Sequence, residues 1–535
     1  MKKTYGLSSS VILAAGLLCL LFFLASGGPN RKTQSRPVVL RIGSTDRVKS
    51  PNFLFDYNLG LFSHLSNPPL MKMSKEGEFI GQLIEEIIPS PDKKSWAFIL
   101  KEDLFWSDGR KVTAEDVRFT LRYIGQELPA AGWLKVGVRR ISTAGENSVR
   151  IELHNPYSRM GVEFATHKLL PKHIWQDIDH PLRYTPSGAQ VGCGPFIIAD
   201  VDTNRGVVIF QKNPYWKGPS PKIDGIEIHF FQNKDVLSFA LEKGDIDIFY
   251  DYASSYPYSS LAKLKSNPRF GFIENMNMAL CFLGFNLRKP PMDDFLFREA
   301  ISCAVNYQEI IKIDLMGYGQ VPNRGFVPPS MEFFKDTPPL LFDPSRAKEI
   351  LEKAGYKDGN ENGVVEDGQG NDIELIILIS PDYARLAELV GDYLRNIGLK
   401  TRLKIVDRST WVNLKDRYRY DLVVTRSSPW GMLMHAGWAT GYFDSRRTGE
   451  GVLHVLDDPA FLELCDRTLS SSDRSAEKNS AHEIQDYYAS NLPAIPLYWN
   501  VIVTPFNREF EGWIIDPLYG IYNIDSFMNI ERRSR

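Results

Sequence analysis

A regular alternation of helical and extended segments between residues 293 and 426 constrains this fold more than any other sequence feature. Three short apolar runs there have the composition of buried strands: DIELIILI, KTRLKIV and YDLVVTR. The segment 383–399 between the first two repeats its apolar residues at the spacing of an amphipathic helix. Strands that alternate with helices of this length predict an α/β lobe.

Helix boundaries can be placed from local signals. In FDPSRAKEILEKAGY, Asp343 is a predicted N-cap, Pro344 occupies the first helical position, and Gly355 follows the end. Further upstream, Thr113 and Asp116 have the spacing of a capping box, which predicts that a helix begins there.

The chain before residue 293 predicts a second lobe of mixed α/β type. The extended runs GPFIIADV, VVIFQK and GIEIHFF are followed by the helical KDVLSFALEKG and the extended DIDIFY. A length of 535 residues exceeds what one hydrophobic core usually serves, so two lobes are expected on size alone.

The N-terminus has the layout of an export signal. Lys2 and Lys3 precede an apolar run from Val11 to Ala25, and small residues follow it. We expect residues 1–27 to be a signal peptide or an uncleaved membrane anchor, and residues 28–37 to be a linker. Either alternative places the rest of the chain outside the cytoplasmic membrane, in the periplasm or its equivalent.

Charge and motifs exclude several classes of protein. The 63 Lys and Arg residues are balanced by 65 Asp and Glu residues, which argues against a nucleic-acid partner. No GxSxG or HExxH motif of a hydrolase is present. Four cysteines follow the N-terminal run and form no CxxC motif: Cys193, Cys281, Cys303 and Cys465. We therefore expect neither a cofactor nor a metal cluster. The sequence leaves open whether these cysteines form disulfides.

Five blocks along the chain together resemble one protein family. They are FILKEDLFWSDGRKVTAEDVRFTL, the stretch 192–228 beginning GCGPFIIADV, LGFNLRKPPMDDFLFREAISCAVN, FDPSRAKEILEKAGY and LPAIPLYW. In this order they resemble family 5 of the bacterial extracellular solute-binding proteins, the dipeptide, oligopeptide and nickel receptors of ABC importers.

The resemblance implies a type II periplasmic-binding-protein-like fold: two α/β lobes joined by two hinge strands, with an extra subdomain on the first lobe. The expected hinge strands lie around 278–286 and 494–506. Lobe I would comprise 38–64, 186–277 and 506–535, with the subdomain at 65–185 and lobe II at 278–505. A monomer of this kind would close over a solute and present it to a membrane permease.

The resemblance implies two kinds of ligand. Peptide-binding relatives hold the ligand α-amine with an Asp shortly after the strand that matches YDLVV, because a buried ammonium needs a paired carboxylate. Here no acidic residue follows Asp421 until Asp444, so the chain departs from the peptide-binding pattern, and Asp444 could supply that contact only if the loop folds back. Nickel-binding relatives carry Trp-Gly followed by His in this loop, and Trp430, Gly431 and His435 repeat that order with tighter spacing.

We therefore expect a solute-binding receptor, most simply for a peptide-like ligand, with a nickel or metal chelate as the alternative. His435 is the candidate metal ligand. The candidate ligand-binding residues are Phe285, Trp430, His435, Trp438, Tyr498 and Trp499. An exported hydrolase and a membrane-tethered sensor or chaperone on the same fold remain the rival functions.

Overall fold

A computed structural model of the chain describes residues 37–74, 78–128, 131, 134, 137–158, 160–186, 189–277, 279–427, 443–446, 453, 455–471 and 473–533. Residues Val39–Arg535 form one compact unit, separate from Met1–Val38. The description below concerns the Val39–Arg535 unit. The predicted signal or anchor (1–27) lies outside the described residues.

The region after residue 280 folds as the predicted α/β lobe, called lobe II here. Its strands are β13 (Cys281–Phe285), β15 (Glu374–Ile379), β16 (Lys400–Ile405) and β17 (Leu422–Arg426). Its helices are α8 (Phe295–Ala304), α9 (Tyr307–Asp314), α10 (Pro344–Lys353), α11 (Ala384–Arg395) and α12 (Arg408–Asp416). The apolar faces of these strands and helices share one buried core.

Lobe I is built around the start of the chain. Its strands are β1 (Val39–Ser44), β8 (Phe196–Asp202), β9 (Val207–Lys212), β10 (Gly225–Phe230), β11 (Ile248–Phe249) and β12 (Phe270–Met276). Helices α6 (Lys234–Lys243) and α7 (Tyr258–Lys265) pack on it around a second core. Parallel pairs β1–β10 and β1–β11 adjoin the antiparallel strands β10, β9 and β8, so the lobe is mixed α/β as predicted.

The extra subdomain of lobe I is a separate antiparallel sheet with helices. Strands β4 (Ile84–Pro89), β5 (Ser95–Leu100), β7 (Ser148–Leu153) and β6 (Val138–Ala144) pair in that order. Its helices are α2 (Ala114–Glu127), α4 (Met160–Thr166) and α5 (Lys172–Trp175). The predicted capping box of Thr113 and Asp116 is confirmed at the start of α2.

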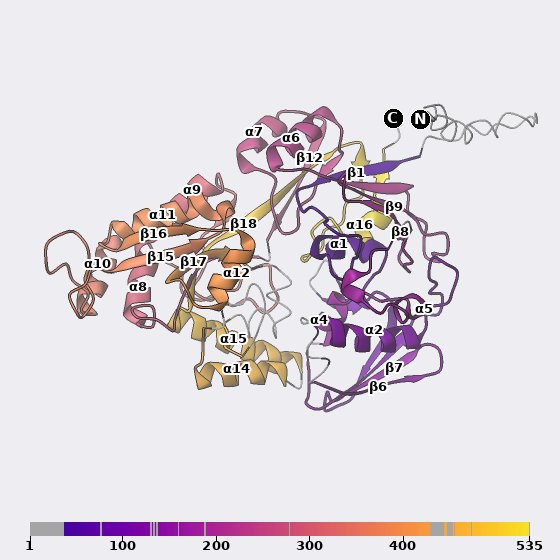
Figure 1. The fold of residues 1–535 in the computed structure, drawn as a ribbon, viewed down its shortest axis with the longest axis horizontal. Helices are drawn as coiled ribbons and strands as arrows, with labels where there is room; N and C mark the ends of the chain where they lie inside the picture. The colour runs from indigo at the N-terminus through magenta and orange to yellow at the C-terminus, as the bar shows by residue number, and fades with distance from the viewer. Residues whose placement is uncertain are drawn as a thin grey trace, which may run out of the picture. The chain divides into compact units, whose positions relative to one another are not determined.

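One long strand, β18 (Ala494–Asn507), belongs to both lobes (Figure 1). Its first part pairs with β13 of lobe II, and its last part pairs with β12 and β11 of lobe I. The second connection passes from β12 to β13, and Asn277 on it donates through its backbone N–H to the carbonyl of Asn500 on β18. Two lobes joined by two strands are therefore the observed architecture.

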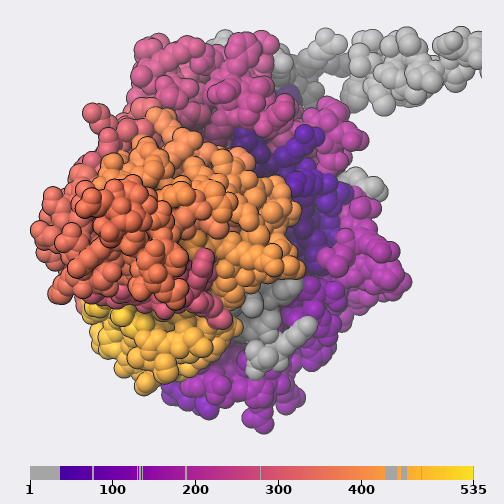
Figure 2. Space-filling view, turned by 60° about the vertical axis from the view of Figure 1, so that its left-hand side comes forward, coloured from indigo at the N-terminus to yellow at the C-terminus, as the bar shows by residue number. Residues whose placement is uncertain are grey.

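The remaining elements complete the lobes. They are α1 (Tyr57–Phe62), η1 (Ser63–Leu65), β2 (Met71–Met73), β3 (Phe79–Gly81), η3 (Pro181–Arg183), β14 (Gly319–Gln320), η4 (Pro381–Tyr383), α14 (Pro459–Leu469), α15 (Arg474–Asn491), β19 (Phe510–Glu511), α16 (Ile524–Asn529) and β20 (Glu531–Arg532). In Figure 2 the yellow-orange surface of α14 and α15 adjoins the orange and red surface of lobe II. Within the described ranges, no helix is both long and apolar enough to cross a bilayer.

Candidate functional site

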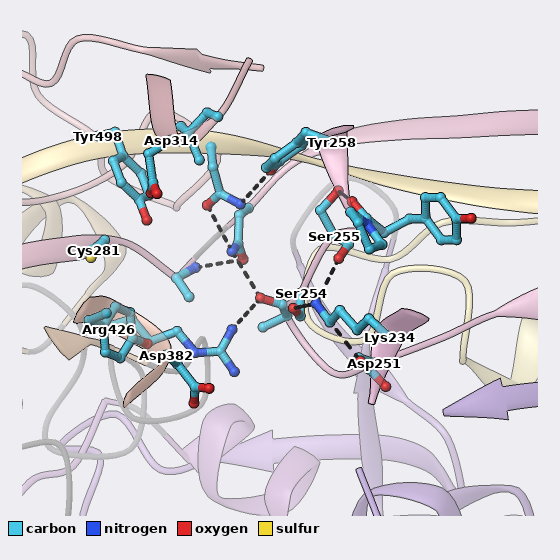
Figure 3. A pocket seen from close by; sticks show the side chains of 18 of the residues that line it. Lys234, Asp251, Ser254, Ser255, Tyr258, Cys281, Asp314, Asp382, Arg426 and Tyr498 are labelled. Carbon is cyan, nitrogen blue, oxygen red and sulfur yellow. Dashed lines mark hydrogen bonds and ion pairs between the residues drawn. The ribbon is translucent and has the colours of Figure 1, made fainter. Parts of the chain in front are cut away.

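A cavity of about 510 Å³ lies where parallel strands of lobe I and of lobe II end. Asp46 follows β1 and Asp251 follows β11, while Asp382 follows β15 and Arg426 ends β17. Ligands of open α/β sheets bind outside the carboxyl ends of the strands. The volume is also within the range of roughly 300–1,000 Å³ that is usual for small-molecule sites. The cavity is therefore the candidate ligand site (Figure 3).

The lobe I wall is organised around the buried carboxylate of Asp251. It accepts hydrogen bonds from the hydroxyl of Ser44 at 2.9 Å and from the backbone N–H and the hydroxyl of Thr45, both at 2.6 Å. The ammonium of Lys234, at the first turn of α6, lies 3.9 Å away. Lys234 also donates to the hydroxyl of Ser254 at 2.8 Å, so this group is held rigidly before any ligand arrives.

Asp46 is the second carboxylate of this wall. Burial, and the nearby negative charge of Asp251, raise the pKa of Asp46 to about 6. One of its oxygens accepts the backbone N–H of Tyr252 at 2.7 Å. At neutral pH the side chain is therefore mostly ionised and still has an oxygen available to a ligand.

A hydrogen bond across the cavity joins the two lobes. The guanidinium of Arg426, from lobe II, donates to the carbonyl oxygen of Ala253, from lobe I, at 2.6 Å. The same carbonyl accepts the side-chain amide of Asn277 at 3.2 Å. Ala253 has a φ of 51°, in the left-handed region that non-glycine residues rarely adopt. The strained backbone at Ala253 directs its carbonyl oxygen toward Arg426. Arg426 is the one arginine among the cavity-lining residues that the structure describes. The carbonyl oxygen resembles a carboxylate oxygen as a hydrogen-bond acceptor.

The lobe II wall carries two more carboxylates beside tyrosine rings. Asp314, the last residue of α9, lies beside Tyr498 of β18 (Figure 3). Burial raises the pKa of Asp314, while Tyr498 and Arg385 act in the opposite direction. Asp382, on η4, lies beside Arg426 in the same view, but the guanidinium and the carboxylate form no ion pair.

The structure describes three of the six predicted ligand-binding residues, and one of these three lines the cavity. Tyr498 lines the cavity. Its neighbour Trp499 points to the other face of β18, as alternate residues of a strand do, and its ring packs on Phe334. Phe285, 0% exposed, belongs to the core of lobe II. The other three predicted residues, Trp430, His435 and Trp438, lie outside the described residues.

The acidic residues Asp421 and Asp444, at and after the strand YDLVV, do not line the cavity. Asp421 is buried just before β17, where it accepts the backbone N–H of Ile376 and pairs with Lys289. Asp444 is fully buried and pairs with Arg446. Asp444 therefore does not line the cavity in this structure, and the amine contact that would require the loop to fold back is not formed by it.

Sequence reasoning missed the charged residues of the cavity: Asp46, Lys234, Asp251, Asp314, Asp382 and Arg426. A signal for three of them was present, since Asp251, Asp382 and Arg426 each stand at or just after a predicted strand. All four cysteines after the N-terminal run are buried and free. In the part of the chain that the structure describes, no three His, Cys, Asp or Glu side chains are grouped to hold a metal ion.

A family model described as "Bacterial extracellular solute-binding proteins, family 5 Middle" matches residues 78–449, more than half of the chain. The chain belongs to this family. Proteins of family 5 are the solute-binding components of ABC importers, and the two-lobed fold with a cavity lined by both lobes is consistent with that role.

Two Escherichia coli (strain K12) relatives illustrate the family. The nickel-binding periplasmic protein is 26% identical over 441 residues, which cover 80% of this chain and 79% of the relative. The probable D,D-dipeptide-binding periplasmic protein DdpA is 23% identical over 459 residues, covering 83% and 84%. Relatives named for different ligands are thus similarly distant from this chain.

Solved structures of the family share the fold. A periplasmic oligopeptide-binding protein from Thermotoga maritima superposes with a TM-score of 0.80 at 20% identity, covering 93% of this chain and 100% of that one. NikZ from Campylobacter jejuni, in complex with Ni(L-His), gives a TM-score of 0.78 at 19% identity, covering 92% and 99%. At these identities the likeness establishes the two-lobed fold of a family 5 protein and nothing about the ligand.

Proposed function

We propose that this family 5 protein is the extracytoplasmic receptor of an ABC importer and captures a small peptide-like solute in the cavity by hinge closure. The observation that carries this proposal is the cavity itself, whose walls come from both lobes and bear charges of both signs. A ligand that contacts both walls binds the closed form better than the open one, and a permease can read that difference.

The cavity chemistry favours a peptide-like solute. Arg426 binds the carbonyl of Ala253 in the structure, and a ligand carboxylate would be a stronger acceptor for the same guanidinium because both partners are charged. Asp46 and Asp314 offer acceptors for an ammonium group. The rings of Tyr258 and Tyr498 supply apolar walls between these charges.

Several sequence-based expectations are kept as part of this proposal. Residues 1–27 direct export, either as a cleaved signal or as an anchor, and the protein works as a monomer without a cofactor. The domain limits are those given for lobes I and II and the subdomain. Tyr498 contacts the ligand together with Trp430, His435 and Trp438, while Phe285 and Trp499 support the cavity wall from behind.

Catalysis is not part of the proposal. Burial raises the pKa of the Cys281 thiol in the cavity wall to about 12, so the thiol stays protonated at neutral pH. The hydroxyl of Ser255 donates to the carbonyl of Tyr256 instead of to a base. Neither group is an activated nucleophile, which favours a binding protein over an exported hydrolase.

A nickel chelate is the second candidate ligand. It is favoured by the similarity to the Escherichia coli nickel-binding protein, which extends over 441 residues. In that case His435 would provide the imidazole ligand and Arg426 would bind a carboxylate of the chelator.

Native mass spectrometry of protein purified without unfolding tests the proposal. We expect a co-purified molecule whose mass fits a short peptide, and its loss after unfolding and refolding. Arg426→Ala should retain about tenfold less of it, because a charge-assisted hydrogen bond is removed. Arg395→Ala, a surface change on α11, is the matched control and should retain the full amount.

If the co-purified molecule shows the isotope pattern of nickel, the ligand is a nickel chelate and not a peptide. A protein that returns only its own mass from every preparation, and that binds neither short peptides nor nickel–histidine in titrations, would contradict the proposed function.

A further inference from the structure

The charges that line the cavity are not balanced. Among the described lining residues, the carboxylates of Asp46, Asp251, Asp314 and Asp382 face the cations of Lys234 and Arg426. The wall therefore carries two more negative than positive groups. Placing such a surplus in an enclosed site is costly unless a bound cation compensates it.

The lobe I charges already compensate one another. Asp251 is saturated by the hydrogen bonds of Ser44 and Thr45 and has the ammonium of Lys234 at 3.9 Å. Lys234 in turn donates to the hydroxyl of Ser254 and the carbonyl of Ser255. This pair contributes no net charge toward a ligand.

Arg426 forms no ion pair with either of the lobe II carboxylates that line the cavity. Its guanidinium donates to the carbonyl of Ala253, and Asp46 is the carboxylate that acts on its pKa most strongly. By sequence, the sixteen residues 427–442 that follow it include no Lys, Arg, Asp or Glu, so they add no fixed charge to offset the surplus.

Two lobe II carboxylates are left facing the cavity. Asp382 forms no hydrogen bond or ion pair with any residue that the structure describes, and its side chain is exposed to the cavity. Asp314 faces Tyr498, with Arg385 offsetting part of its charge. The rings of Tyr383 and Tyr498 line the cavity with these two acids, an arrangement that suits a cation because aromatic faces also attract positive charge.

We propose that the ligand is cationic: a short peptide with a basic side chain, whose ammonium group is held by one of two lobe II carboxylates, Asp314 beside Tyr498 or Asp382 beside Arg426. The inference rests on the proposed function and specifies the class of peptide. The peptide carboxylate takes the place of the Ala253 carbonyl at Arg426, and its α-amine lies toward Asp46.

Titration calorimetry of the full chain with four probes tests the inference. The probes are the tripeptides Ala-Lys-Ala, Ala-Met-Ala and Ala-Glu-Ala, and the diamine putrescine. Lysine and methionine side chains are similar in length, so the first pair isolates the charge. We expect Ala-Lys-Ala to bind at least about tenfold more tightly than Ala-Met-Ala, and Ala-Glu-Ala to bind most weakly.

Variants locate the effect. One of the two variants Asp314→Asn and Asp382→Asn should reduce the Lys-over-Met ratio by about threefold to tenfold, and both should leave the affinity for Ala-Met-Ala within about twofold. Unchanged Ala-Met-Ala binding also shows that the variants are folded. Asp392→Asn, on the exposed side of α11, removes the same charge outside the cavity and should keep the wild-type ratio.

The outcomes separate the two proposals. Equal affinity for the three tripeptides, or a Lys-over-Met ratio unchanged by both cavity variants, overturns the cationic ligand and leaves a peptide receptor. Putrescine binding more tightly than Ala-Lys-Ala keeps the cationic site but overturns the peptide. Failure of every probe to bind, together with failure to bind nickel–histidine, overturns the proposed function itself.

Discussion

Two buried carboxylates of this chain accept hydrogen bonds from backbone N–H groups. Asp251 accepts the N–H of Thr45, and Asp516 accepts the N–H groups of Leu518 and Tyr519 at 2.8 and 2.7 Å. Hydrogen bonds of this kind favour the charged form, whereas burial opposes it. The balance at each residue decides whether the charge stabilises or destabilises the fold.

At Asp516 burial dominates and raises the pKa of the carboxyl group from its usual value near 3.8 to about 7. The folded state therefore holds a proton that the unfolded state releases between about pH 4 and 7. Stability contributed by this residue is lost as pH rises through that window.

Asp516→Asn should remove this penalty, since its amide oxygen can accept the same two N–H groups without a charge. We expect the variant to be more stable than the wild type at pH 8, by up to about 4 kcal/mol, and equally stable at pH 4. Urea unfolding at the two pH values measures the difference. The exposed Asp336→Asn is the control, and an Asp516→Asn gain of the same size at both pH values would refute the account.

At the scale of elements, local signals in the sequence placed helices and strands well. The helix predicted from Asp343, Pro344 and Gly355 is α10, where Asp343 accepts the N–H of Arg346 and Gly355 has a φ of 92°. The three apolar runs of lobe II became β15, β16 and β17. Caps, turns and apolar spacing act within a few residues, so one sequence suffices to read them.

The site could be predicted only in part because it is assembled from distant elements. Asp46 and Asp251 meet although 205 positions separate them, and no local pattern reports such a pairing. The sequence analysis chose aromatic residues in the blocks that resemble the family. This choice included Tyr498, which lines the cavity, but also Phe285 and Trp499, which do not. The register of β13 and β18 decides which of these faces the cavity, and register is a tertiary property.

The capping box of α2 gives a test at this scale. Asp116 accepts the backbone N–H and the hydroxyl of Thr113 and also the backbone N–H of Lys172 at the start of α5, so one side chain joins two helix starts. We expect Asp116→Ala to lower the free energy of unfolding by about 2 kcal/mol, at the upper end for a helix cap. Chemical denaturation measures the change, and Glu115→Ala, on the same turn but half-exposed, should cost clearly less. Equal losses would show that the connection to α5 adds nothing.

At the scale of the whole molecule, the hinge and the ligand site are the same region. Asn277 and Asn500 connect the two strands that join the lobes, and both line the cavity. Arg426 of lobe II and Ala253 of lobe I make a contact that a ligand can replace. A bound solute therefore acts directly on the groups that set the angle between the lobes.

Small-angle X-ray scattering of the chain, alone and saturated with the tightest ligand found, tests this coupling most directly. We expect the radius of gyration to fall on saturation, because a ligand that contacts both walls favours the closed form. Arg426→Ala, at a ligand concentration that saturates it, should show a smaller fall. An unchanged profile, recorded while native mass spectrometry shows the ligand bound to the wild type, would contradict hinge closure over the cavity.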